Sequence, residues 1–439
     1  MSFDDIIISS PIWITAFFAV IITGIYFDPN LVYLFANTLS YAVLKLLVDT
    51  SPYWLPVFMG VVFWKAWMNY VRADYISKCT SVLLEIKLPQ EIAKSPLAME
   101  TVLMSLYQTG METTFIDRNW KGQVRAVFSL EIVSIEGQVK FYIHTLKKFK
   151  TLIETNLHSH YQGIEVHEAT DYSKSVYFDP KKIVVYTINY KKGMIDAYPI
   201  KTYTDYGIDK EQVDEENKID PLNHVLEFFA AVPHGHQAWL QIVIRAHKGE
   251  QRKHGTWFEK TDRWKDEGKA EVEKIRAEAI PKDQIEEGVT KFPNPTKGQQ
   301  ERIAAIERCI SKFAFDTGIR SIYFGPVKTF DGSNISSMRA ILRSFSDPHL
   351  NNIKPVGGMD RFDYPWEDFR DIRKNIIRRN AFDAYKRRSF FFPPHIGESH
   401  VFNVEELATM FHLPGKVATT QNLNRIPSKK SDAPSNLPI

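Results

Sequence analysis

An apolar block at residues 6–71 constrains this 439-residue chain more than any other stretch. Its three apolar runs cover residues 12–27, 31–48 and 53–71. A helix needs about 20 mostly apolar residues to cross the ~30 Å core of a bilayer, and the second and third runs come close to that length. We therefore expect residues 1–75 to be a transmembrane anchor of two or three helices.

Basic residues predict how this anchor is oriented. Arg72, Lys78 and Lys87 follow the block, whereas residues 1–5 contain no basic side chain. Because cytoplasmic loops of membrane proteins carry an excess of Lys and Arg, we expect the rest of the chain in the cytoplasm. The alternative is a helical pair buried in a soluble core, although three such runs in so short a stretch rarely fit one core.

The composition sets limits on the remaining chain. It is too long for one ordinary core and predicts two or three domains. The net charge of +3 favours no polyanion partner for the chain as a whole, so any such partner needs a local basic surface. Cys79 and Cys309 lie far apart and show neither a disulfide framework nor a zinc-binding spacing, which fits a reducing compartment.

Residues 76–173 show the alternation of one compact α+β module. Strands are expected at residues 81–88, 124–134, 139–144 and 163–168, and helices at residues 96–109 and 146–157. The turn between the second and third strands is Glu136-Gly137. The order β-α-β-β-α-β is that of a ferredoxin-like module.

A second, less regular set of elements follows. We expect an expanded α+β module at residues 174–350, with a charged helical insert at residues 248–282 that has ten Lys or Arg and eight Asp or Glu. A helical region is expected at residues 351–413 and a mobile tail at residues 414–439. The predicted fold is therefore α+β, with transmembrane helices followed by tandem ferredoxin-like modules and a C-terminal helical region.

Motifs for catalysis are missing from the sequence. A phosphate-binding loop ends in Gly-Lys-Ser or Gly-Lys-Thr, whereas this chain has only Gly268-Lys269-Ala270 and Gly415-Lys416-Val417. Neither His234-Gly-His236 nor the nearby His224 and His247 have the spacing of a metal site. The acidic pair Glu405-Glu406 is expected on a solvated face. We expect no enzymatic activity, no cofactor and no metal.

The strongest local charge lies at residues 361–388, with nine Lys or Arg against five acidic residues. Trp366, Phe369, Ile372, Ile376 and Ile377 would give a helix here one apolar stripe. Its basic face could then bind phosphate of a nucleic acid or of lipid headgroups, although a solvated helix paired with acidic neighbours is an equal alternative. The predicted contact residues are Arg370, Arg373, Lys374, Arg378, Arg379, Arg387 and Arg388.

Several phrases of the sequence resemble one known family. They lie at residues 84–91, 95–100, 120–125, 128–137, 403–415, 428–430 and 434–438. Together they resemble the N-terminal, membrane-attached region of bacterial conjugation or type IV secretion-like DNA-transfer ATPases. In that family a RecA-like motor follows the stretch corresponding to residues 434–438, but this chain ends at Ile439, so no catalytic residue can be carried over.

The resemblance implies a non-enzymatic platform or adaptor of a conjugative DNA-transfer machine, held in the bacterial inner membrane. It also implies a separate motor ATPase as partner, docked by the C-terminal region through Phe411, Pro414, Lys429 and Lys430. The lipid bilayer, DNA and further copies of the chain are the other expected partners. The alternative function is a membrane-tethered module that binds nucleic acid or anionic lipid.

Overall fold

The computed structural model describes most of the chain between residues 41 and 415. The described residues are 41–42, 45–46, 48–89, 94–112, 114–209, 219–249, 251–252, 260–279, 294–356, 364 and 366–415. The chain divides into two compact units, Met1–Val71 and Arg72–Ile439.

Helix α4, Ser51–Lys78, is the main described element of the first unit and ends in the second. It covers the third apolar run, and many of its apolar side chains are exposed, among them Tyr53, Val57 and Phe63. However, none of the helices within the described residues is long and apolar enough to cross a membrane. Polar or weakly apolar residues such as Pro56 and Lys65 interrupt the run, which explains the difference.

The predicted transmembrane helices are therefore wrong where the structure describes the chain. The first apolar run and most of the second lie outside the described residues.

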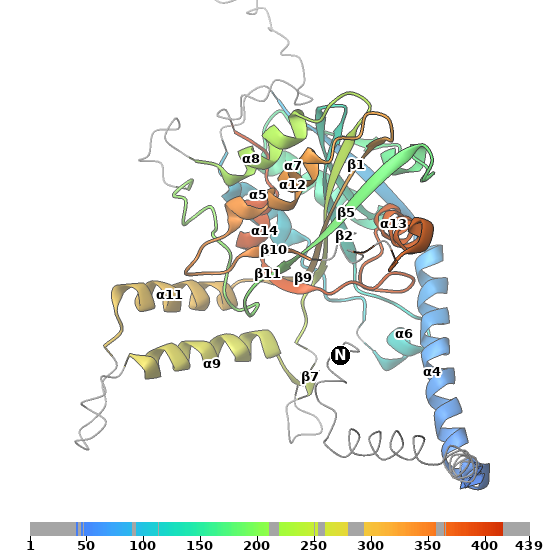
Figure 1. Ribbon diagram of the computed structural model, residues 1–439. Coiled ribbons are helices and arrows are strands. Elements are labelled where there is room, and N and C mark those ends of the chain that lie inside the picture. Colours follow the sequence, from blue (N-terminus) through green and yellow to red (C-terminus); the bar gives the residue numbers. More distant parts are fainter. Residues whose placement is uncertain are drawn as a thin grey trace, which may run out of the picture. The chain divides into compact units, whose positions relative to one another are not determined.

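A nine-stranded sheet forms the centre of the second unit (Figure 1). Its strands are β1 (Ser81–Lys87), β2 (Val127–Ile135), β3 (Gln138–Leu146), β4 (Glu165–Ala169), β5 (Ile183–Lys192), β6 (Gln237–Ala246), β9 (Ala314–Pro326), β10 (Ile353–Val356) and β11 (His400–Asn403). Their order is β10-β5-β9-β6-β2-β3-β1-β4, and β11 pairs with β9. Each of these pairings is antiparallel.

The sheet contains the same four-strand order twice. Strands β1 to β4 follow the order β4-β1-β3-β2, with α5 (Pro96–Ser105) and α7 (Lys150–His160) as the two connecting helices. Strands β5, β6, β9 and β10 repeat it as β10-β5-β9-β6, with α8 (Pro221–Ala230) and α12 (Ser333–Ala340). Both halves thus have the β-α-β-β-α-β connection of a ferredoxin-like module. The sheet continues without a break across residue 173, where a domain boundary was expected.

The two halves meet where β2 pairs with β6. Nine residue pairs join these strands, from Val127 with Arg245 to Ile135 with Gln237. Glu131 faces Gln241 at the middle of this ladder. Because the two halves have the same strand order on either side, an approximate twofold axis passes close to the Glu131 and Gln241 pair.

The two faces of the sheet are covered differently (Figure 1). Helices α5, α7, α8, α12 and α14 (Val404–Met410) lie on one face, where strand residues such as Phe128, Leu130 and Ile132 join the largest core cluster. Successive side chains of a strand alternate between faces, so Glu131 and Val133 point to the other side. There α13 (Ile372–Lys386) packs through Phe382 and Tyr385.

The charged insert contains one long helix, which packs with a second helix beside the sheet (Figure 1). Helix α9, Arg263–Glu278, packs along α11, Lys297–Ser311. Val272 and Ile275 of α9 contact Ile303 and Ile306 of α11 in a small separate core. The insert helix therefore has a buried side and a charged side, and the short strands β7 (Gln251–Arg252) and β8 (Lys260–Thr261) precede it.

Candidate functional site

The predicted basic helix begins later in the chain than expected. Arg370 and Asp371 have φ angles of 57° and 55°, so the helix starts only at Ile372 and not near Trp366. The carboxylate of Asp368 accepts hydrogen bonds from the backbone N–H groups of Arg373 and Lys374, both at 2.8 Å. Asp368 thus fills the position where a helix N-terminus could bind phosphate, and any phosphate contact has to come from side chains.

The apolar stripe expected to be the packed side of this helix is largely exposed. Trp366 has 77% of its surface exposed, and Ile372 and Ile376 have 54% each. Trp366 stacks on Tyr364, with ring centroids 4.8 Å apart and ring planes 9° apart. The buried residues of α13 lie in its C-terminal half, so its N-terminal half presents apolar and basic side chains together.

Most of the predicted phosphate contacts lie on this exposed half. Arg370, Arg373 and Arg379 are exposed, and Lys374 and Arg378 are half-buried. The Arg373 guanidinium donates to the carbonyl of Glu367 at 3.4 Å, which places it next to the stacked aromatic pair. Lys374 lies 3.5 Å from the exposed carboxylate of Asp371.

Arg387 and Arg388 have opposite environments although they are neighbours. Arg387 is exposed and pairs with Asp383 at 2.8 Å. Arg388 is buried, with its guanidinium 3.0 Å from Glu131 and 2.6 Å from Asp171. The structure therefore places the predicted phosphate contact Arg388 against two carboxylates of its own chain and not on the exposed surface.

The Arg388 ion pairs belong to a buried polar network at the approximate twofold axis. Burial alone would raise the pKa of Glu131, but the charge and hydrogen bonds of Arg388 lower it. Glu131 also accepts hydrogen bonds from Tyr172 and from Gln241, both at 2.7 Å. Gln241 in turn accepts from Arg320 at 2.6 Å, which continues the network across both halves of the sheet. The network holds the C-terminal end of α13 on the sheet.

The sequence carries a partial signal for this network. Glu131 alternates with Leu130 and Ile132, which is typical of a strand with one polar face. Alternation shows which residues share a face, but it does not show that a helix 240 residues later covers that face. The role of Asp171 and the environment of His144 carried no sequence signal.

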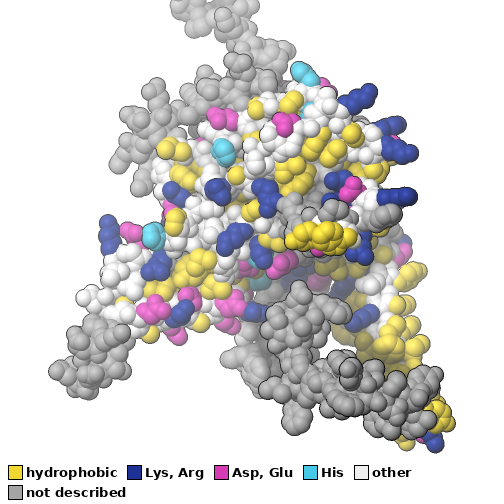
Figure 2. All heavy atoms as spheres, in the orientation of Figure 1, with side chains coloured by type: hydrophobic (Ala, Val, Ile, Leu, Met, Phe, Trp, Pro, Cys, Tyr) yellow, Lys and Arg dark blue, Asp and Glu magenta, His cyan; other side chains and the backbone are white. Residues whose placement is uncertain are grey.

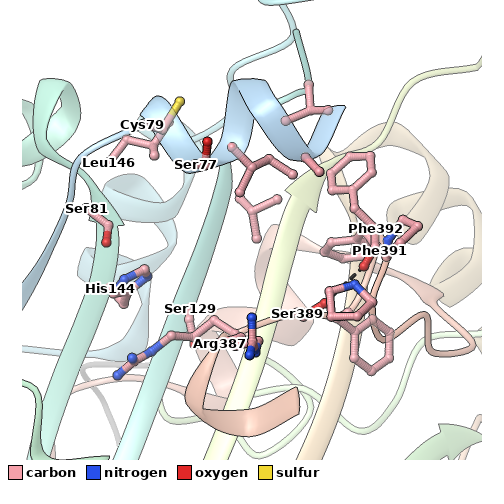
Figure 3. A pocket seen from close by; sticks show the side chains of 18 of the residues that line it. Ser77, Cys79, Ser81, Ser129, His144, Leu146, Arg387, Ser389, Phe391 and Phe392 are labelled. Atoms are coloured by element: carbon pink, nitrogen blue, oxygen red, sulfur yellow. Dashed lines mark hydrogen bonds between the residues drawn. The ribbon is translucent and has the colours of Figure 1, made fainter. Parts of the chain in front are cut away.

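A pocket of about 540 Å³ lies beside this network (Figure 3). Ser77 at the end of α4 and Cys79 directly after it line the pocket, and Ser129 and His144 line it from the sheet (Figure 3). Residues 386–394 form the opposite wall, which includes the rings of Phe391 and Phe392. Ser389 donates to the carbonyl groups of Phe392 and His395, at 2.9 and 3.1 Å, and so holds this segment in a tight loop.

His144 is the titratable group on the floor of this pocket. Burial, followed by the nearby positive charge of Arg388, lowers the pKa of His144 to about 4, against the opposing effects of Glu131 and Asp171. Its imidazole is therefore neutral at pH 7. It can donate or accept one hydrogen bond at the pocket surface.

A second titratable cluster joins the sheet to the helical insert. His247 follows β6 and lies 2.6 Å from Asp316 of β9 and 3.2 Å from Asp262, the N-cap of α9. Arg245 also pairs with Asp316, at 2.7 Å. Where the chain is described, no group of three or more His, Cys, Asp or Glu is placed to hold a metal ion.

The residues predicted to dock a motor are only partly described. Phe411 is fully buried and contacts Phe141 in the main core, with ring centroids 5.8 Å apart, and Pro414 is buried as well. The structure thus places both of these predicted docking residues in the core and not on an exposed surface. Lys429 and Lys430 lie outside the described residues.

Glu405 and Glu406, expected on a solvated face, are also buried. Each lies 2.8 Å from a lysine, Glu405 from Lys312 and Glu406 from Lys192. The C-terminal segment that contains α14 is thus part of the core.

Comparisons with known proteins identify a family but no activity. No curated protein matches the chain. Nothing in the comparisons supports the predicted roles in secretion and conjugation. One family model, described as a domain of unknown function (DUF8128), matches residues 77–425, which include the whole sheet and α13. The chain therefore belongs to the DUF8128 family.

Proposed function

We propose that this chain is a non-enzymatic module that binds single-stranded nucleic acid through the exposed half of α13. The contact surface, which we call the α13 face, consists of Tyr364, Trp366, Arg370, Arg373 and Arg379. The observation that carries the proposal is the exposed, stacked pair of Tyr364 and Trp366 next to exposed arginines.

Two physical effects support this proposal. An exposed aromatic ring can stack on a base of a single strand, which contributes about 1–3 kcal/mol per base without selecting a sequence. Arginine side chains neutralise phosphates, and their guanidinium groups match the geometry of phosphate oxygens. Arg373 and Arg379 are six residues apart, so they lie about 9 Å apart along the helix axis and can contact different phosphates.

Anionic lipid headgroups are a second candidate ligand for the same face. Ile372 and Ile376 are both 54% exposed and lie one turn apart, between Arg379 and Arg373 on the helix surface. An apolar pair flanked by cations is typical of helices that lie in a lipid interface. The stacked aromatic pair favours nucleic acid, and the isoleucine pair favours lipid.

A binding experiment distinguishes these ligands. Fluorescence anisotropy would measure the affinity for a labelled single-stranded oligonucleotide and for a duplex of equal length, and co-sedimentation would measure binding to vesicles with and without anionic lipid. We expect the single strand to bind more tightly than the duplex, and we expect Trp366→Ala and Arg373→Glu/Arg379→Glu each to weaken binding by roughly tenfold or more.

The control has to carry the same change in charge elsewhere. Figure 2 shows Lys and Arg side chains spread over one face of the molecule, with acidic side chains gathered over α9, so basic character is not confined to α13. Lys147→Glu/Lys148→Glu changes two exposed lysines directly after β3 and should leave binding unchanged. Equal losses in both double variants would contradict a specific α13 face. If Trp366→Ala and Arg373→Glu/Arg379→Glu weakened binding to anionic vesicles but not to the oligonucleotide, the α13 face would be assigned to lipid.

A further inference from the structure

The pocket beside α13 has the size of a small-molecule site. Its volume of about 540 Å³ exceeds the 110 and 280 Å³ of two other pockets in the described part of the chain. Pockets that bind small organic molecules typically measure about 300–1,000 Å³. Its walls come from the end of α4, from β1 to β3 and from residues 386–394, so folding alone brings them together.

The charges around this pocket favour an anion. One acidic residue, Asp171, lines the pocket. Its basic lining residues are Arg125, Lys174, Lys386, Arg387 and Arg388. Arg388 is neutralised by Glu131 and Asp171, and Arg125 lies within 4 Å of Glu112 and Asp316.

Two exposed cations line the pocket, because Lys386 is half-buried and donates to the carbonyl of Val176 at 2.8 Å. Lys174 is exposed, and the ion pair of Arg387 among the described residues is with the partly exposed Asp383. These two side chains are the ones that can turn towards a negatively charged group of a ligand.

The interior of the pocket combines apolar walls with the imidazole of His144. Phe391 and Phe392 form one side (Figure 3). The guanidinium of Arg245 lies 4.4 Å from the Phe391 ring centroid and fixes its position. His144 lines the other side, and neither of its ring nitrogens hydrogen-bonds within the described part of the chain. Its neutral imidazole is available to a polar group of a ligand.

We propose that this pocket binds an amphipathic small-molecule anion, with its acidic group between Lys174 and Arg387 and its apolar body against Phe391 and Phe392. The ligand class follows from the net positive rim and the aromatic wall. This site is separate from the α13 face and does not depend on nucleic-acid binding.

Cys79 provides a readout at the pocket itself. The chain has two cysteines; Cys79 lines the pocket, whereas Cys309 is buried and burial raises the pKa of its thiol. The rate at which iodoacetamide alkylates Cys79, followed by mass spectrometry of the intact protein, therefore reports occupancy of this pocket. The probes are decanoate and 1-decanol, which have the same chain length and differ in charge.

The proposal predicts selective protection of Cys79. We expect decanoate to slow the alkylation at concentrations roughly tenfold lower than 1-decanol, because only the carboxylate can bind the rim cations. In Lys174→Glu/Arg387→Glu this difference should disappear, and both substituted side chains are exposed, so folding should be unaffected. Arg373→Glu/Arg379→Glu should retain the difference.

Two results would overturn the proposal. One is equal protection by decanoate and 1-decanol in the unchanged protein, and the other is full protection by decanoate in Lys174→Glu/Arg387→Glu. Because Arg373→Glu/Arg379→Glu affects only the α13 face, failure of nucleic-acid binding and failure of this pocket can be told apart.

Discussion

At the scale of single residues, burial decides what an arginine can do. Arg387 and Arg388 are adjacent in a basic run, yet one pairs with an exposed carboxylate and the other is enclosed with Glu131 and Asp171. An exposed ion pair contributes little to stability because water and salt screen it. Removing one partner of a buried pair leaves an uncompensated charge and is strongly destabilising.

We predict that Arg388→Met lowers the free energy of unfolding by about 3–5 kcal/mol, because Glu131 and Asp171 lose their shared cation in a buried site. The matched variant Arg387→Met should change it by less than about 0.5 kcal/mol. Urea denaturation followed by circular dichroism measures both values. Equal effects of the two substitutions would show that Arg388 is not enclosed as described.

At the scale of elements, His247 connects the sheet to the helical insert. It contacts Asp316 on β9 and Asp262 at the start of α9. Burial alone would lower the pKa of His247, but hydrogen bonds and charges of these two carboxylates raise it to about 9. A group whose pKa is raised in the folded state stabilises the fold below its unfolded pKa of about 6.5 and loses this contribution as the pH rises.

We therefore predict a loss of stability between pH 6.5 and pH 9 on the order of 3 kcal/mol, due to His247. In His247→Gln the free energy of unfolding should be lower at pH 6 and should vary much less over this range. Denaturant titrations at pH 6, 7.5 and 9 would measure the change. His158→Gln, at an exposed position, should keep the pH dependence of the unchanged chain. Identical pH profiles in His247→Gln and His158→Gln would exclude His247 as the source of this pH dependence.

At the scale of the whole molecule, the β2 and β6 pairing makes two modules one structure. Nine residue pairs join them, and α13 covers the junction from one side. If either module unfolded alone, the other would expose an edge strand with apolar residues on both faces. The second unit should thus unfold in one transition, with no separate step at residue 173.

We predict that Leu84→Ala in β1 lowers the free energy of unfolding by about 2–5 kcal/mol, because Leu84 is fully buried. The free energy of opening, measured by amide hydrogen exchange, should fall by the same amount in β5 and β9, which belong to the other module. Leu97→Ala, at a position 53% exposed, should have little effect on exchange in either module. If Leu84→Ala accelerated exchange in β1 to β4 only, the modules would be independent domains.

The sequence by itself determined the local elements of the described chain. The strands expected at residues 124–134 and 139–144, and the helices expected at residues 96–109 and 146–157, lie close to where the structure has β2, β3, α5 and α7. These signals depend on neighbours within a few residues, and they are therefore readable from one chain. The same reading was wrong for a transmembrane helix at residues 53–71, because Pro56 and Lys65 interrupt the apolar run and the helix that contains it is not apolar enough to cross a membrane.

Only the tertiary structure decided which polar residues became a site. Pairing of β2 with β6 placed Glu131 beside Gln241, and α13 then brought Arg388 onto them. The same fold buried Phe411 and left Trp366 exposed. Burial depends on contacts between segments hundreds of residues apart, and a local pattern contains no information about them.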